Sequence, residues 1–235
     1  MSLPRILNPH LAPVVQHDAH LPPLAPERLT AATLRQRFAQ TAVWQPEFEG
    51  DGGIGAAREP AHAAVLVPLV QREDHGDGGL HVLLTRRTDH LRDHAGQISF
   101  PGGRTEPEDS SPAATALREA EEEVGLPHGQ VEVIGHMPTY TTVTSYVVTP
   151  VVALVRAPYS LALDSFEVAE AFEVPLAFLM NPANHQRRVF TFEGTQRQFL
   201  SMPWQGPGAD GQRREYFIWG ATAAMLRNLY RFLAA

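Results

Sequence analysis

The segment from Ser111 to Gly125 carries the start and stop signals of one helix, and it constrains the fold more than any other part of the chain. Ser111 can cap the first turn, and Pro112 suits the first helical position. Gly125 is a common residue at a helix C-terminus, because it adopts the left-handed backbone conformation easily. Leu117, Ala120 and other apolar residues recur on one face, so we expect this helix to pack on a sheet.

Apolar runs before and after the helix predict that sheet. We expect strands at 61–70, 80–87, 131–137 and 146–155. Asp77-Gly78 favours a tight turn between the first two strands, and Pro101-Gly102-Gly103 is expected to be an obligatory loop. Mixed strands with few helices indicate an α+β fold or an α/β/α sandwich.

The first 60 residues are expected to form an N-terminal extension to a domain of residues 61–235. Residues 1–25 are rich in Pro and His without any period, so we interpret them as an arm that packs on the domain or stays mobile. Residues 30–40 predict a short helix, and the composition of residues 49–55 is that of a linker.

The last 70 residues combine three predicted elements. Residues 168–179 mix helical spacing with an internal proline, so we expect a helix that breaks at Pro175. The segments 188–192 and 198–202 predict a hairpin. Residues 220–233 predict an amphipathic C-terminal helix.

Composition excludes several kinds of chemistry. The chain has no Cys and no Lys, so thiol nucleophiles, Cys-based metal sites, Schiff bases and the GxxxxGK phosphate loop are excluded. The net charge of −7 gives no sign of a nucleic-acid partner. No apolar run is long enough for a membrane span, and residues 1–20 lack the order of a signal peptide, so we expect a cytoplasmic protein.

Three glutamates near the end of the 112–124 helix break the rules for a stable helix. Glu119, Glu122 and Glu123 share one face at a spacing of i, i+3 and i+4, whereas Glu121 points to solvent. Like charges at this spacing repel, and carboxylates oppose the dipole at a helix C-terminus. A solvated acidic surface is the plain alternative. A bound divalent cation would remove the conflict, and clustered oxygen ligands without His or Cys suit Mg²⁺ or Mn²⁺.

These residues resemble the Nudix box, G-x5-E-x7-R-E-U-x-E-E-x-G-U, in which U is aliphatic. The box begins here at Gly103, and residues 118–126 match every fixed position of its second half. The first half departs from the pattern, because Asp109 replaces the first glutamate and eight residues separate it from Arg118. The resemblance implies a Nudix α/β/α sandwich with a mixed sheet and metal-dependent hydrolysis.

A second motif, LLTRRTDHLRDHAGQISFPGG at 83–103, is similar to the signature of the coenzyme A pyrophosphatase branch of Nudix hydrolases. Thr88 stands where that branch usually has Ser or Ala. Residues 216–229 also resemble this branch. Together, the resemblances cover about residues 61–235 and imply cleavage of coenzyme A to 3′,5′-ADP and 4′-phosphopantetheine.

The resemblance also implies roles for individual residues. Glu119, Glu122 and Glu123 match the metal-binding glutamates, and Arg118 matches the arginine that orients them. Glu122 is either a third ligand or the general base, and Glu170 is kept as another candidate base beside its interpretation as a surface helix residue. The predicted substrate-binding residues are Arg86, Arg87, Arg92, Gln97, Ser99, Gly102 and Gly103.

Three questions stay open at the level of the sequence. Another nucleoside diphosphate derivative, such as NADH or ADP-ribose, is an alternative substrate. A ligand sensor without catalysis is a second alternative, although such proteins usually lose box glutamates. The sequence allows a homodimer without requiring one.

Overall fold

The computed structural model describes residue 6 and residues 8–40, 43–51, 60–72, 79–91, 94–192, 195–208 and 210–235. The larger of its two sheets has eight strands, which follow the path β4-β3-β2-β8-β6, with β5 beside β2, β7 beside β8 and β9 beside β3. These strands are β2 (Ala61–Gln71), β3 (Leu80–Arg87), β4 (Ile98–Ser99), β5 (Gly102–Arg104), β6 (Val131–His136), β7 (Tyr140–Thr141), β8 (Tyr146–Arg156) and β9 (Val168–Pro175). The sheet is mixed, because β2 and β8 run parallel whereas the other pairs are antiparallel.

The smaller sheet is antiparallel and has the order β1-β10-β11-β12. Its strands are β1 (Val14–His17), β10 (Gln186–Phe192), β11 (Thr195–Pro207) and β12 (Arg213–Trp219). The α-helices are α1 (Ala31–Ala39), α2 (Pro112–Val124), α3 (Leu176–Leu179) and α4 (Gly220–Ala234). Short 3-10 turns lie at Pro9–Leu11, Pro26–Leu29, His128–Gln130 and Pro182–Asn184.

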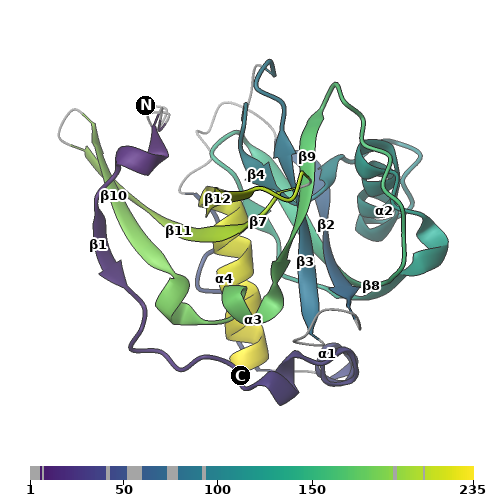
Figure 1. The fold of residues 1–235 in the computed structure, drawn as a ribbon, viewed down its shortest axis with the longest axis horizontal. Coiled ribbons are helices and arrows are strands. Elements are labelled where there is room, and N and C mark those ends of the chain that lie inside the picture. The colour runs from purple at the N-terminus through teal and green to yellow at the C-terminus, as the bar shows by residue number, and fades with distance from the viewer. Residues whose placement is uncertain are drawn as a thin grey trace.

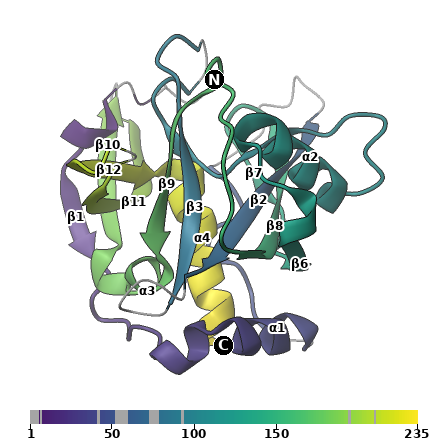
Figure 2. The ribbon, with the colours of Figure 1, turned by 45° about the vertical axis from the view of Figure 1, so that its right-hand side comes forward.

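Helices cover both faces of the large sheet, which confirms the predicted sandwich (Figures 1 and 2). Helix α2 packs through Ala116 and Ala120 on one face, against residues such as Leu66 and Leu83. The opposite face packs against α4, the small sheet and α1, in a second and larger core. Alternating side chains of β3 explain this division, because successive residues of a strand point to opposite faces.

Most elements predicted in the body of the chain are present, with two exceptions. Residues 168–175 form strand β9 and not a helix, and only the short α3 follows Pro175. The burial of these residues alternates along the strand, and β9 pairs with β3 over most of its length, so strand pairing outweighs the helical spacing of the apolar residues. Strand β12 was not predicted.

The second exception is the predicted loop at 101–103. Gly102 and Gly103 belong to β5, which pairs with Val65 and Ala64 of β2. A side chain on Gly102 would collide with the Val65 backbone, so the glycine permits a close strand contact that most residues prevent. The predicted turn at Asp77-Gly78 lies outside the described residues, as do residues 52–59 of the predicted linker.

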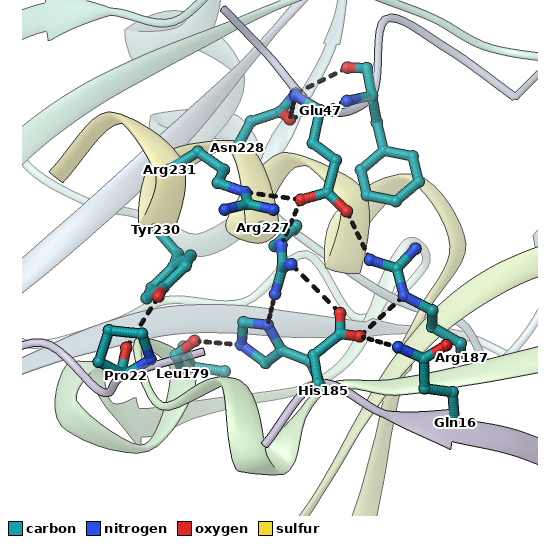
Figure 3. Close-up of polar contacts among 12 residues, drawn as sticks. Gln16, Pro22, Glu47, Leu179, His185, Arg187, Arg227, Asn228, Tyr230 and Arg231 are labelled. Carbon is teal, nitrogen blue, oxygen red and sulfur yellow. Dashed lines mark hydrogen bonds and ion pairs between the residues drawn. The ribbon is translucent and has the colours of Figure 1, made fainter. Parts of the chain in front are cut away.

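The described part of the N-terminal region packs on the body of the protein. Strand β1 pairs with β10, and Leu34 of α1 is fully buried. A polar cluster joins this region to α4 and β10, and we call it the arm cluster: Asp18, Glu47, His185, Arg187, Arg227 and Arg231 (Figure 3). Its centre is Arg227, which is completely buried and contacts both carboxylates.

The two carboxylates of the arm cluster are well neutralised. Burial alone would raise the pKa of Glu47, but hydrogen bonds from Arg227, Arg187 and Arg231 outweigh it and lower the pKa to about 2. Burial lowers the pKa of His185 to about 4, so its ring is neutral at pH 7. The cluster therefore holds the N-terminal region to α4 with its charges paired.

The longest described helices, α2 and α4, have 13 and 15 residues, and no helix in the described part of the chain could cross a lipid bilayer.

Candidate active site

Helix α2 has the ends that the sequence predicted. The Ser111 side chain accepts a hydrogen bond from the amide of Ala114, and Pro112 is the first helical residue. Gly125 ends the helix in the left-handed conformation, with a φ of 67°. These ends fix where the last turn lies, and the three box glutamates lie in its final six residues.

The three glutamates differ in their exposure. The side chain of Glu123 is 6% exposed, that of Glu119 is 17% exposed and that of Glu122 is 60% exposed. Along one side of α2, their exposure therefore increases from Glu123, which is buried, to Glu122, which is in contact with solvent. Glu121 points away from them, and its carboxylate lies 3.3 Å from His128.

An ion pair between Asp109 and Arg118 supports the box glutamates. The Nε and Nη2 atoms of Arg118 donate to the two carboxylate oxygens of Asp109 at 3.1 and 2.9 Å. This bidentate pair lowers the pKa of Asp109 well below its usual range. Asp109, which replaces the first glutamate of the box pattern, therefore holds Arg118 in place.

Arg118 in turn holds two of the glutamates. Its Nη1 atom donates to Glu119 at 3.0 Å and to Glu122 at 2.9 Å. Arg118 and Glu122, which are four residues apart on the helix, therefore form an ion pair. The guanidinium sets the positions of both carboxylates, but its single positive charge is shared among Asp109, Glu119 and Glu122.

Glu123 is buried against the segment that precedes the helix. Its Oε2 atom accepts the amide hydrogen of Gly102 at 3.1 Å, and its Oε1 atom lies 3.6 Å from Arg87. Burial raises its pKa to about 7 in spite of these two contacts. A buried carboxyl with a raised pKa is one that lacks sufficient positive charge around it.

Gly103 lies directly against Glu119. A Cβ atom at residue 103 would be 2.5 Å from the Glu119 carboxylate, so only glycine leaves room for that group. Burial also raises the pKa of Glu119, and the nearby charge of Glu122 adds to the effect. Both glycines that the sequence predicted for the site therefore contact a box glutamate, Gly102 through its amide and Gly103 through its lack of a side chain.

Glu167 is a member of the site that sequence reasoning missed. It lies in the loop before β9, and its carboxylate is 3.9 Å from Arg87. Its charge raises the pKa of both Glu119 and Glu123. No local pattern predicts it, because it reaches the site through the pairing of β9 with β3. We call the whole set the box cluster: Arg87, Asp109, Arg118, Glu119, Glu122, Glu123 and Glu167.

The structure divides the other predicted residues between two faces of the sheet. Arg86 and Arg87 are neighbours on β3, and their side chains point to opposite faces. Arg87 faces Glu123, whereas Arg86 lies 3.7 Å from Glu170 on β9. Glu170 is thus a buried strand residue, not a surface helix residue as one interpretation held.

Glu170 belongs to a second polar site on its own face. It accepts a hydrogen bond from the hydroxyl of Tyr216 at 2.8 Å and lies 3.5 Å from Arg214. A cavity of about 630 Å³ opens beside it, and its wall includes Arg86 and Gln97. Arg86 and Glu170 therefore face this cavity, on the side of the sheet opposite to α2.

The remaining predicted residues lie close to these two sites or outside the described chain. Gln97 contacts the His94 ring at 2.8 Å. The Ser99 hydroxyl lies 3.2 Å from that of Thr85, which is on the same face of β3 as Arg87. Arg92 lies outside the described residues.

The donor atoms of the box cluster suit a hard divalent cation. Its five carboxylates face two arginines, and two of those carboxyls have raised pKa values. Among the described residues, no three acidic or imidazole groups are arranged to ligate one ion together. Arg118 engages both Glu119 and Glu122, so those carboxylates would have to turn from it toward an ion. The fit lies in the chemistry of the donors and in their unbalanced charge.

Comparison with known proteins identifies the family to which this chain belongs. The model of the NUDIX domain matches residues 60–193, which is more than half of the chain. The uncharacterized Nudix hydrolase NudL of Escherichia coli O7:K1 (strain IAI39 / ExPEC) is 44% identical over 170 residues, which cover 71% of this chain and 80% of that protein. The protein of the same name from Escherichia coli (strain K12 / DH10B) is 42% identical over 168 residues, which cover 71% of this chain and 80% of that protein.

Solved structures include more distant matches. A Caenorhabditis elegans Ap4A hydrolase, in a binary complex, has a TM-score of 0.41 and 22% identity, and the match covers 48% of this chain and 80% of that one.

Proposed function

Since this chain belongs to the Nudix hydrolase family, which cleaves phosphoanhydride bonds of nucleoside diphosphate derivatives and generally uses divalent metal ions, we propose that it hydrolyses the diphosphate of coenzyme A. The products would be 3′,5′-ADP and 4′-phosphopantetheine. The resemblance of residues 83–103 to the coenzyme A signature is the reason for choosing this substrate among those of the family.

One observation supports this choice most strongly. The signature segment forms β3, β4 and β5, and it lies directly against the box glutamates. Arg87, the Gly102 amide and the space left by Gly103 all contact Glu119 or Glu123. A motif that discriminates substrates by contact would lie in the substrate site, and the position of this segment beside the box glutamates supports that role.

We assign the metal to Glu119, Glu122 and Glu123, with Mg²⁺ or Mn²⁺ as the ion. A cation bound there would neutralise the phosphates and make a bound water more acidic. Glu123 must lose its proton to act as a ligand, and its pKa of about 7 makes that loss dependent on pH. Glu119 and Glu123 are the principal ligands in this proposal.

The remaining residues would orient the metal ligands, bind the diphosphate or accept a proton from water. Arg118, fixed by Asp109, would hold Glu122 and Glu119 on the same side of α2 until an ion draws their carboxylates away from it. Arg87 would contact the diphosphate, because Arg binds phosphate oxygens in a bidentate way. Glu122 is the first candidate for the general base, since it is the most exposed of the three glutamates and accessible to water. Glu170 is the less direct candidate, because it faces the opposite cavity.

The identity of the products tests this function. The protein is incubated with coenzyme A and Mg²⁺ or Mn²⁺, and the nucleotide products are separated and identified. We expect 3′,5′-ADP and 4′-phosphopantetheine in equal amounts. Equal or faster hydrolysis of ADP-ribose or NADH in the same panel would reject coenzyme A as the substrate, and no hydrolysis with tight binding of coenzyme A would favour a sensor.

A further inference from the structure

An exposed aromatic side chain lies at the rim of the box cluster. The Phe166 residue is 64% exposed, and it directly precedes Glu167, whose carboxylate reaches Arg87. The ring of His90 lies beside it, with the two ring centroids 4.8 Å apart. An aromatic pair that is exposed to water beside a charged cluster is a candidate contact for a ligand.

The loop that carries Phe166 is fixed to helix α2. The amides of Ala162 and Asp164 donate to the carbonyl oxygens of Val124 and Glu123, both at 2.9 Å. These are carbonyls at the C-terminal end of α2, next to the box glutamates. Gly125 makes the approach possible, because a Cβ at that position would be 2.8 Å from the amide nitrogen of Ala162.

Further hydrogen bonds hold Phe166 itself. Its amide donates to the Asp164 carboxylate at 2.9 Å, and its carbonyl accepts from the buried Thr88 hydroxyl at 2.8 Å. The Thr88 amide donates to the carbonyl of Glu167 at 2.9 Å. The backbone under the exposed ring is therefore fixed both to the end of β3 and to α2, so the ring is presented from a rigid support.

We propose that Phe166, with the His90 ring tilted at 59° against it, forms a stacking platform for the nucleobase of the substrate. Phe166 directly precedes Glu167, and Thr88, which donates to the Phe166 carbonyl, directly follows Arg87. A ligand whose diphosphate reaches the box cluster could therefore place its nucleoside on this surface. Every nucleobase has a flat face that stacks on aromatic rings, and such contacts need no charge on the ligand. The inference extends the proposed function by assigning a subsite for the adenine end of the substrate.

Binding measurements distinguish the contribution of the nucleoside to affinity from that of the diphosphate. ADP and inorganic pyrophosphate are titrated by calorimetry into the full-length protein with Mg²⁺, because the two ligands differ by the nucleoside. Phe166→Ala is expected to weaken ADP binding roughly 5- to 100-fold and to leave pyrophosphate binding unchanged. Phe166→Trp should retain ADP binding, with a change in tryptophan emission when ADP is added.

Leu163→Ala provides the matched control, because Leu163 is an exposed side chain of the same loop. It should bind both ligands as the wild type does. The proposal is overturned if Phe166→Ala binds ADP normally, if it loses pyrophosphate to the same extent, or if only 4′-phosphopantetheine binding is weakened. None of these results depends on coenzyme A hydrolysis, so the platform and the proposed substrate can fail separately.

Discussion

The arm cluster and the box cluster contain the same kinds of side chain, but arginines outnumber carboxylates in the first and carboxylates outnumber arginines in the second. In the arm cluster, two carboxylates face three arginines, and the pKa of Glu47 is lowered to about 2. In the box cluster, five carboxylates face two arginines, and burial raises the pKa of Glu123 to about 7. The charges of the first set are paired within the protein, whereas the second set has an excess of negative charge that a cation would neutralise.

This difference separates a structural role from a chemical one. Buried charges that are fully paired can hold two segments together, and removal of one partner is costly. Buried carboxylates without enough partners reduce stability, which a chain tolerates where they serve a function. We therefore expect changes in the arm cluster to affect stability and changes in the box cluster to affect turnover.

The largest expected effect is on catalysis. Glu123→Gln removes a proposed ligand without changing the size of the side chain, and turnover should fall by roughly 10²- to 10⁴-fold. Steady-state kinetics with Mg²⁺ measures the loss, and circular dichroism verifies the fold. Glu121→Gln is the control on the same helix and should keep normal turnover. Near-normal activity of Glu123→Gln would remove this residue from the site.

Sequence reasoning predicted the box cluster well where the signals were local. Ser111, Pro112 and Gly125 defined the helix, and the spacing of Glu119, Glu122 and Glu123 placed them on one side of it. The positions of Glu167 and Phe166 could not be found in this way, because strand pairing and the contacts of one loop with α2 determine them.

The errors have the same origin. The spacing of residues 168–179 predicts a helix that contains Glu170, but β9 pairs with β3 and buries Glu170 on the face of the sheet opposite to α2. Gly102 and Gly103 were assigned to a loop because glycines favour loops, whereas here they allow β5 to approach β2. The arm cluster was not predicted at all, since Asp18 and Glu47 meet Arg227 only after the two ends of the chain come together.

The arm cluster should give the largest effect on stability. Arg227→Met leaves Asp18 and Glu47 buried with fewer partners, and it should lower the free energy of unfolding by about 3 kcal/mol. Urea denaturation measures this loss, while kcat of the folded enzyme stays normal. Arg35→Met serves as the comparison, because its pair with Glu132 is exposed and should contribute less than about 1 kcal/mol. An equal effect of both changes would show that the arm cluster is not a special anchor.

The pH dependence of stability distinguishes the clusters without any change in sequence. The pKa of Glu123 rises from 4.5 to about 7 on folding, so its contribution is present below pH 4.5 and is lost as pH rises through 7. The pKa of His185 is lowered from 6.5 to about 4, so its contribution is present above pH 6.5 and is lost as pH falls through 4.

Metal-free Glu123→Gln isolates the first of these contributions. Between pH 5 and 8, this variant should gain stability relative to the wild type, by at most about 3 kcal/mol. Urea denaturation in the presence of a chelator measures the difference at each pH. A difference that does not change with pH would mean that Glu123 titrates normally in the folded protein.

Asp109→Asn should give the smallest of these effects. The variant keeps the shape of the side chain but loses the charge that fixes Arg118, so the box glutamates lose their support. Loss of such a supporting contact typically weakens metal affinity by roughly 10- to 100-fold. Titration of activity against Mg²⁺ measures the shift, and saturating Mg²⁺ should restore much of the turnover. Unchanged metal dependence would show that Arg118 is held well enough by other contacts.

Binding of Mn²⁺ to the protein without substrate tests the central claim most directly. Paramagnetic resonance counts the bound ion in the wild type, in Glu119→Gln with Glu123→Gln, and in Arg227→Met. The unbalanced charge of the box cluster predicts Mn²⁺ binding by the wild type and by Arg227→Met, and strongly weakened binding by the double variant. Equal Mn²⁺ binding by all three proteins would contradict the assignment of the ion to these glutamates.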